Sequence, residues 1–189
     1  MKVLGIVCSP RKGGNTEIMV TEALAAAQEA GAETNLFTVS GKNIAPCDGC
    51  GACLKSGVCK IKDDMQPLYQ ELLAADGIVF GTPVYWNNVS AQAKTIMDRT
   101  YAFRQTRPLR GKVAAGVVAL RRIGAGQVLS LLYSYFVAQR MIIVGGGVGF
   151  GRDKGEVREG VGGAPGSTAL EEARAIGAGV VRMVGRMGK

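Results

Sequence analysis

The stretch VLGIVCSPRKGGNT, residues 3–16, decides the fold. It begins with a continuous apolar run rich in β-branched side chains, which is typical of a strand buried on both faces. The residues that follow are polar and rich in glycine, and Asn15 or Thr16 can cap a helix that runs to about Ala30. A buried strand that passes through a short polar loop into a helix is the opening unit of a parallel α/β sheet.

The same alternation of apolar runs and helical stretches continues to the end of the chain. The predicted strands are 3–8, 35–39, 78–80, 112–120 and 141–144. The predicted helices begin near residues 15, 63, 90, 128 and 168, with Asp63 and Gln66 spaced as a capping box. This order predicts a single α/β domain over residues 1–189, a doubly wound, five-stranded parallel sheet with helices on both faces.

The loops that follow the strands are the expected place for a site. In a doubly wound sheet, ligands bind beyond the carboxyl ends of the strands. The loops on that rim are 8–15, 40–62, 82–90, 120–127 and 145–167. Two of them are long. We expect 40–62 to be a cysteine-rich insertion and 145–167 to be a mobile flap or a subunit contact.

Composition narrows the function classes. The chain has 189 residues, of which 47% are hydrophobic and 20% are charged, so a packed core is feasible. It contains no histidine, which excludes His-dependent triads and His metal ligands. Lys and Arg number 23 against 15 Asp and Glu, a net charge of +8. Because the basic residues are scattered and only 6% of residues are aromatic, this charge favours anionic small molecules, and we expect no nucleic-acid partner.

The apolar runs and the cysteines indicate the cellular compartment in which the protein is expected. No apolar run approaches the ~18–20 residues of a membrane span, and the run at 3–8 is too short for a signal-peptide core. We therefore expect a cytoplasmic protein with no membrane partner. Four of the five cysteines lie in one loop, which in a reducing compartment favours metal or redox chemistry over structural disulfides.

The first loop has the parts of an anion site. It matches neither the Gly-x-Gly-x-x-Gly fingerprint nor a Walker loop. It nevertheless offers side-chain donors, glycines that let backbone N–H groups approach an oxyanion, and the positive end of a helix. The donors and cations of this loop are Ser9, Arg11, Lys12, Asn15 and Thr16. The alternative is an ordinary polar turn before a capped helix.

Three segments resemble the flavodoxin-like NAD(P)H-dependent FMN reductases. Ser9-Pro10-Arg11-x-x-Gly-Asn15-Thr16 resembles their phosphate loop, and residues 81–86 (GTPVYW) and 89–99 resemble their second flavin loop and the helix after it. The resemblance implies a flavodoxin-like sheet of order 2-1-3-4-5 and FMN as cofactor. It implies phosphate contacts from Ser9, Arg11, Asn15 and Thr16, and ring contacts from Pro83, Val84, Tyr85, Trp86, Asn87 and, at the polar edge, Leu120 and Arg121.

Other interpretations of the ring residues stay open. Tyr85 or Trp86 can stack on a flat flavin ring, but Trp86 could instead be a core or subunit-interface aromatic. Arg121 could stabilise negative charge on a reduced flavin. Family members often have small residues there, so Arg121 and Arg122 could equally belong to a solvated loop.

The second rim loop holds Cys47-x2-Cys50-x2-Cys53-x5-Cys59. This spacing resembles iron–sulfur ligation, and more closely the cysteine motif of the iron–sulfur flavoproteins, which implies a [4Fe–4S] cluster held by these four residues. A zinc site usually uses two well-separated pairs, but zinc stays an alternative, as does an empty or oxidised loop beside FMN alone. The fifth cysteine, Cys8, is expected to be a small buried apolar residue.

Together these patterns predict a flavin-dependent oxidoreductase that passes electrons between FMN and a [4Fe–4S] cluster, with no protein residue as nucleophile or base. The resemblance implies ferredoxin or NAD(P)H as donor, quinone, dioxygen or peroxide as acceptor, and a homodimer or homotetramer. One alternative is an NAD(P)H-dependent FMN or quinone reductase without a cluster. Another is a non-enzymatic nucleotide-binding or zinc-stabilised module.

Overall fold

The computed structural model describes residues 1–158 and 168–187, and its centre is a parallel sheet. Five strands run in the order β2-β1-β3-β5-β6, which confirms the predicted five-stranded order when they are counted along the chain. A sixth, short strand, β4, was not predicted and pairs antiparallel with the end of β3. The strands are β1 Lys2–Val7, β2 Glu33–Thr38, β3 Gly77–Tyr85, β4 Asn88–Val89, β5 Val113–Leu120 and β6 Ile142–Phe150.

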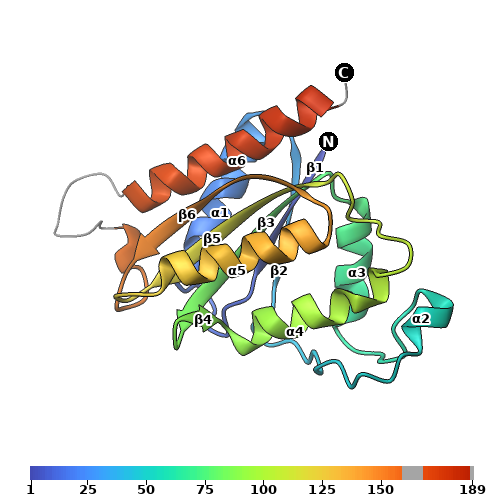
Figure 1. The fold of residues 1–189 in the computed structure, drawn as a ribbon. Coiled ribbons are helices and arrows are strands. Elements are labelled where there is room, and N and C mark those ends of the chain that lie inside the picture. The colour runs from blue at the N-terminus through green and yellow to red at the C-terminus, as the bar shows by residue number, and fades with distance from the viewer. Residues whose placement is uncertain (159–167, 188–189) are drawn as a thin grey trace.

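Helices cover both faces of the sheet, as predicted. Figure 1 shows α3, α4 and α5 on one side of the sheet and α1 and α6 on the other. The bounds are α1 Asn15–Glu29, α2 Cys53–Ser56, α3 Met65–Ala74, α4 Ala91–Arg99, α5 Ala125–Ala138 and α6 Thr168–Met187, with 3-10 turns η1 Thr100–Phe103 and η2 Glu156–Arg158. In the described parts of the chain, no helix is both long and apolar enough to cross a membrane.

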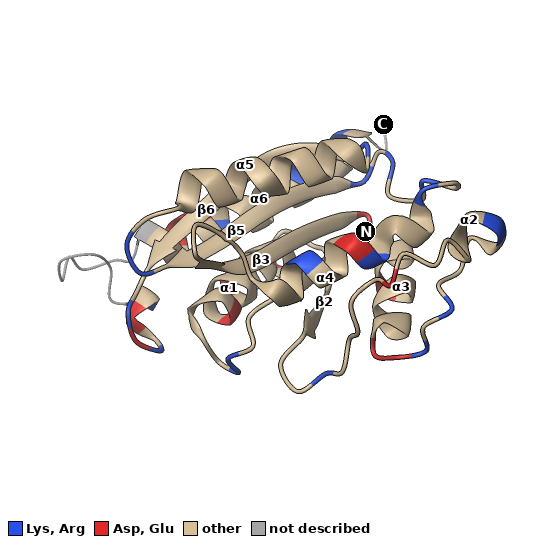
Figure 2. Ribbon diagram, turned by 60° about the horizontal axis from the view of Figure 1, so that its bottom comes forward, with Lys and Arg blue, Asp and Glu red and all other residues tan. Residues whose placement is uncertain are grey.

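Alternation along β1 divides the core into two layers. Leu4 and Ile6 belong to the layer under α3, α4 and α5, whereas Val3 and Val7 belong to the layer under α1 and α6. Cys8 is fully buried in the first layer, as expected of a small apolar residue, and burial raises the pKa of its thiol. Charged residues lie mostly on loops and helices and leave the strands nearly free of charge (Figure 2).

The two helix caps predicted for Asn15 or Thr16 and for Asp63 are wrong, whereas the predicted helix start near residue 90 is confirmed. Helix α1 is capped by the backbone of Gly14, without a side-chain hydrogen bond, so Asn15 and Thr16 lie inside the helix. Asp63 does not form a capping box with Gln66: its carboxylate accepts from the N–H of Met65 at 3.1 Å and pairs with Arg99, and the Gln66 amide donates to the Ile61 carbonyl instead. Ser90 does cap α4, and its hydroxyl accepts a hydrogen bond from the backbone N–H of Ala93 at 3.1 Å.

The predicted loop 145–167 begins too early. Residues 145–150 continue β6 and pair with β5 up to Leu120. Glycine occupies this strand because a Cβ on Gly147 would lie 2.8 Å from Ile176, and one on Gly149 would lie 2.4 Å from Met19. The run lacks the β-branched residues that signal a strand because helices pack directly on its backbone. The predicted flap or subunit contact falls partly on residues 159–167, which lie outside the described residues.

The predicted loop 82–90 is also largely strand. Residues 81–83 continue the parallel ladder with β5, and the chain then turns back through a hairpin into β4. Trp86 and Asn87 form the turn, and both have positive φ, 51° and 58°. A two-residue hairpin turn of this hand requires positive φ at both positions, a conformation that Asn tolerates and that is rare for a bulky residue such as Trp.

Candidate functional site

A cavity of about 250 Å³ opens at the carboxyl end of the sheet, where the loops after β1, β3, β5 and β6 meet. Nine of the twelve residues predicted to bind the cofactor line this cavity. They are Ser9, Arg11, Asn15, Thr16, Pro83, Val84, Tyr85, Leu120 and Arg121. The remaining lining residues are Gly14, Ala119, Gly151, Arg152, Asp153 and Lys154. Lys12, Trp86 and Asn87 are not among the residues that line it.

The first loop forms the floor of the cavity. Ser9 and Thr16 are almost fully buried, and the Ser9 hydroxyl accepts a hydrogen bond from the backbone N–H of Arg11 at 3.2 Å. Gly13 has φ +64°, which turns the chain into α1, and its N–H donates to the Glu17 carboxylate at 2.6 Å. The loop therefore already holds one carboxylate on its backbone donors, as expected of an anion-binding turn at a helix start.

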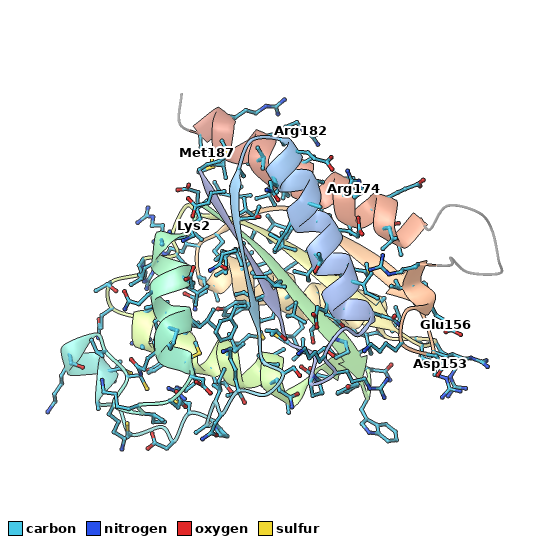
Figure 3. The ribbon with its side chains drawn as sticks, turned by 180° about the vertical axis from the view of Figure 1, so that it is seen from behind. Lys2, Asp153, Glu156, Arg174, Arg182 and Met187 are labelled. Carbon is cyan, nitrogen blue, oxygen red and sulfur yellow. The ribbon has the colours of Figure 1, made fainter. Side chains whose placement is uncertain are left out.

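Asn15 holds the wall of the cavity in place. Its side-chain amide donates to the carbonyl of Asp153 at 2.9 Å and accepts from the N–H of Gly155 at 2.8 Å. Figure 3 shows Asp153 and Glu156 in the segment after β6, beside the start of α1. Glu156 closes this turn by accepting from the N–H groups of Asp153 and Arg152, and these hydrogen bonds lower the pKa of Glu156. Asn15 thus positions the segment rather than pointing freely at a ligand.

The hairpin after β3 forms the apolar wall. Pro83, Val84 and Tyr85 line the cavity, and Tyr85 is partly exposed. Trp86, at the tip of the hairpin, is 99% exposed, so the interpretation as a core aromatic is wrong. A Cβ on Gly124 would lie 2.7 Å from the Asn87 side chain and 2.9 Å from Val84, so glycine is required where α5 meets this hairpin.

Sequence reasoning missed the cations after β6. Arg152 and Lys154 line the cavity with the predicted Arg11 and Arg121, against a single acidic lining residue, Asp153. This surplus of positive charge favours an anionic ligand. The predicted rim loop 145–167 contains both residues, but its predicted role is a flap or subunit contact, so neither residue is among those predicted for the cofactor site.

The four clustered cysteines line a second, smaller cavity of about 40 Å³. Cys47 and Cys50 are exposed, and Cys53 and Cys59 are half-buried. Gly49, Gly51 and Gly57 all have φ near +70°, which gives the tight turns between the thiols. Figure 1 shows α2, which begins at Cys53, projecting from the body beside α3 and α4.

Charges also accompany the thiols. Asp48 pairs with Lys60 at 3.0 Å, and hydrogen bonds from Cys50 and Lys60 lower the pKa of Asp48 to about 2. Burial raises the pKa of Cys53, and the neighbouring thiolates of Cys59 and Cys47 raise it further. All four thiols line the same small cavity, so a negative charge on one of them opposes ionisation of the others.

The donor set fits an iron–sulfur cluster, because four thiols on one loop line one cavity. Among residues 1–158 and 168–187, however, no three His, Cys, Asp or Glu side chains are placed to hold a metal ion. This placement argues against a single ion such as zinc, whose ligands must meet at one point, and it does not test a four-iron cluster, in which each thiolate binds a different iron.

The sheet order and the cation-rich cavity at its carboxyl end define the class of protein: a flavodoxin-like α/β protein built for an anionic ligand. A model of the NADPH-dependent FMN reductase family matches residues 1–155. The chain is similar over its full length to the solved WrbA-like flavodoxin of Agrobacterium tumefaciens, with a TM-score of 0.66, 19% identity and 98% of that chain covered, which supports the fold.

Two relatives are similar in sequence as well. An iron–sulfur flavoprotein of Methanocaldococcus jannaschii is 39% identical over 194 residues, with 97% of each chain covered. An iron–sulfur flavoprotein of Archaeoglobus fulgidus is 45% identical over 150 residues, which cover 77% of this chain and 76% of the relative. The chain belongs to the NADPH-dependent FMN reductase family and is a flavin-dependent oxidoreductase that uses FMN.

Proposed function

We propose that the protein transfers electrons between FMN, bound in the 250 Å³ cavity, and a [4Fe–4S] cluster, bound by Cys47, Cys50, Cys53 and Cys59. The observation that carries this proposal is that the loop after β1 lines the larger cavity, and the loop after the neighbouring strand β2 carries all four thiols that line the smaller one. The two loops are also tied together, because the Ser40 hydroxyl at the start of the cysteine segment donates to the carbonyl of Pro10 at 3.2 Å.

The residues that line the larger cavity have distinct parts in this proposal. Ser9, Thr16 and the backbone of the first loop face the phosphate, and the Arg11 guanidinium neutralises its charge. Tyr85 and Pro83 supply the apolar surface against which a flat ring packs. Arg121 lies where positive charge would stabilise electron density at the polar edge of the ring.

When bound, FMN exchanges one or two electrons at its ring, whereas an iron–sulfur cluster exchanges one at a time. The protein contributes binding, orientation and charge, and we assign no side chain as nucleophile or general base. Ferredoxin or NAD(P)H would serve as donor, and quinone, dioxygen or peroxide as acceptor. The +8 net charge would attract an acidic ferredoxin, and we propose a homodimer or homotetramer as the working assembly.

A second candidate is an NAD(P)H-dependent FMN or quinone reductase without a cluster. It is favoured by the match of the NADPH-dependent FMN reductase family model over residues 1–155, since that family is named for flavin chemistry and not for a cluster. The two candidates differ in iron content.

Protein purified without air is expected to contain iron and acid-labile sulfide and to show flavin absorption bands on a broad iron–sulfur envelope. Flavin bands with less than one iron per chain would contradict the cluster and leave the reductase. A colourless protein that cannot be reconstituted with FMN would contradict both.

Replacing Arg11 with Ala is expected to weaken FMN binding. A charge-assisted hydrogen bond to phosphate contributes roughly 1.5–3 kcal/mol, which corresponds to a loss of about 10- to 150-fold in affinity. Titration of flavin-free protein with FMN, followed by fluorescence quenching, measures this loss. Lys12→Ala is the matched control, because Lys12 carries the same charge one residue away but does not line the cavity. Equal losses in the two variants would show that net charge alone attracts the cofactor.

A further inference from the structure

Arg99, the last residue of α4, is a fully buried positive charge behind the cysteine loop. Its guanidinium forms a two-pronged ion pair with Asp63, with one nitrogen at 2.7 Å and the other at 3.0 Å from the two carboxylate oxygens. Burial alone would raise the pKa of Asp63, but hydrogen bonds from Arg99 and the Ala45 backbone hold it below its ordinary value. Both groups therefore stay charged inside the protein.

The same guanidinium holds both ends of the cysteine segment. One nitrogen donates to the carbonyl of Ala45 at 2.7 Å, just before Cys47, and the other donates to the carbonyl of Ile61 at 3.3 Å, just after Cys59. Asp63 reinforces the first end by accepting from the N–H of Ala45 at 2.9 Å. Arg99 thus joins the two ends of residues 46–60 from inside the protein. Outside this segment, the Asn43 N–H donates to the Asp64 carboxylate at 2.7 Å, and the Gln66 amide donates to the Ile61 carbonyl at 2.6 Å.

Between these ends, the segment makes hydrogen bonds mainly to itself. The N–H of Cys50 donates to Asp48, that of Leu54 to Gly51 and that of Gly57 to Cys53. Such local bonds shape single turns and do not fix where the segment lies relative to the sheet. The position of the thiols therefore depends on the hydrogen bonds of Arg99 at both ends of the segment and on the packing of Cys53 and Cys59 against the core.

Arg99 also lies beside the thiols. It lines the 40 Å³ cavity with all four cysteines, and its Nε–H is buried without a hydrogen-bond partner among the described residues. A buried donor without an acceptor is costly, so this N–H is available to a hydrogen-bond acceptor that binds beside Arg99. Burial opposes the charge of Arg99, yet Asp63, and more weakly Tyr69 and Cys59, hold its pKa above the ordinary value.

We propose that Arg99 is a positioning residue for the iron–sulfur ligands: its two terminal nitrogens hold the ends of residues 46–60, and its Nε–H donates a hydrogen bond to a cysteine sulfur of the bound cluster. The hydrogen bond from Nε–H to a cluster sulfur rests on the proposed function. The role of the two terminal nitrogens does not, because it concerns the protein without metal. A planar fork is required, because a lysine ammonium cannot bridge two carbonyls and a bidentate carboxylate at once.

The test uses three variants of the full chain. Arg99→Lys keeps the charge and removes the fork, and the pair Arg99→Met with Asp63→Asn removes the charge without leaving a buried carboxylate unpaired. Lys94→Met is the control, because Lys94 is an exposed cation of the same helix whose ion pair is with Asp98. Flavin content shows that each variant has folded, since the FMN cavity lies on other loops.

The first measurement uses metal-free protein and the rate of trypsin cleavage after Lys55, inside the cysteine loop. We expect cleavage at least ten times faster in Arg99→Lys and in the paired variant than in the original protein, and an unchanged rate in Lys94→Met. A rate in Arg99→Lys and the paired variant equal to that of the control would overturn the positioning role, whether or not the protein binds iron.

The second measurement uses protein loaded with iron and sulfide. Hydrogen bonds to sulfur stabilise the reduced, more negative cluster, so Arg99→Lys is expected to hold less iron per flavin and to have a more negative cluster midpoint potential. An unchanged potential would overturn the Nε–H contact. If the original protein itself binds no iron, the proposed cluster and this contact both fail, while the cleavage rates still decide the role of the fork.

Discussion

Replacing Gly177 with Ala is expected to destabilise the protein by roughly 2–3 kcal/mol, as overpacking of a dense core does. Gly177 lies where α6 crosses α1, and a Cβ built there would lie 1.8 Å from the carbonyl oxygen of Ala23. A backbone oxygen cannot rotate away as a side chain can, so the two helices must separate. Urea unfolding followed by circular dichroism measures the change in the free energy of unfolding.

Gly179→Ala is the control, two residues along the same helix. Its Cβ would meet only the end of the Arg182 side chain, at 3.7 Å. Because glycine is a poor helix former, this change is expected to be neutral or to stabilise the protein by up to ~1 kcal/mol. A Gly177→Ala protein as stable as Gly179→Ala would contradict the close approach of α1 and α6 in Figure 1.

Replacing Cys50 with Ser is expected to remove nearly all bound iron and to leave FMN in place. Cys50 lines the cysteine cavity on its exposed side, and a neutral hydroxyl is a much weaker ligand for iron than a thiolate. The FMN cavity contains none of the four clustered cysteines, so the flavin should be retained. Iron, sulfide and flavin are measured per chain in protein prepared without air.

Cys8→Ala is the matched control for this experiment. Cys8 is fully buried in the core beneath α3, α4 and α5 and lies outside the cysteine cavity. Its removal is expected to lower stability slightly and to leave both iron and flavin unchanged. Full iron content in Cys50→Ser would show that Cys50 is not a ligand. Loss of iron in Cys8→Ala would show that a change in the core is enough to prevent iron binding, so that loss of iron in Cys50→Ser could not be assigned to a lost ligand.

Local sequence patterns predicted the strands best where the strands are rich in β-branched side chains. The runs at 3–8 and 112–120 are rich in valine, and both are buried strands. The glycine-rich residues 145–149 gave no such signal. Glycine is needed there because helices from distant parts of the sequence pack directly on the backbone of the strand. Tertiary packing therefore determines where β6 ends. It also determines that Arg152 and Lys154, which follow β6, line the larger cavity.

The caps show the same division. Ser90 caps α4 through a contact three residues away, which local spacing describes well. Asp63 lies just before α3 and accepts from the N–H of Met65, but the same carboxylate also binds Arg99, 36 residues away, which local spacing does not indicate. Local spacing is compatible with several partners for one residue. Because Arg99 is buried away from water, its charge needs a partner inside the protein, and Asp63 is that partner.

By itself the sequence determined the fold class, the order of strands and helices, the loops that carry the site and the four thiols grouped on one of them. These depend on hydrophobic period and on residues close together in the chain. Only the tertiary structure decided that Asn15 supports the segment after β6, that Trp86 lies fully exposed at a hairpin tip and that Arg99 joins the two ends of the cysteine segment. Those roles depend on which distant groups meet, and a buried charge or amide takes the partners that folding brings to it.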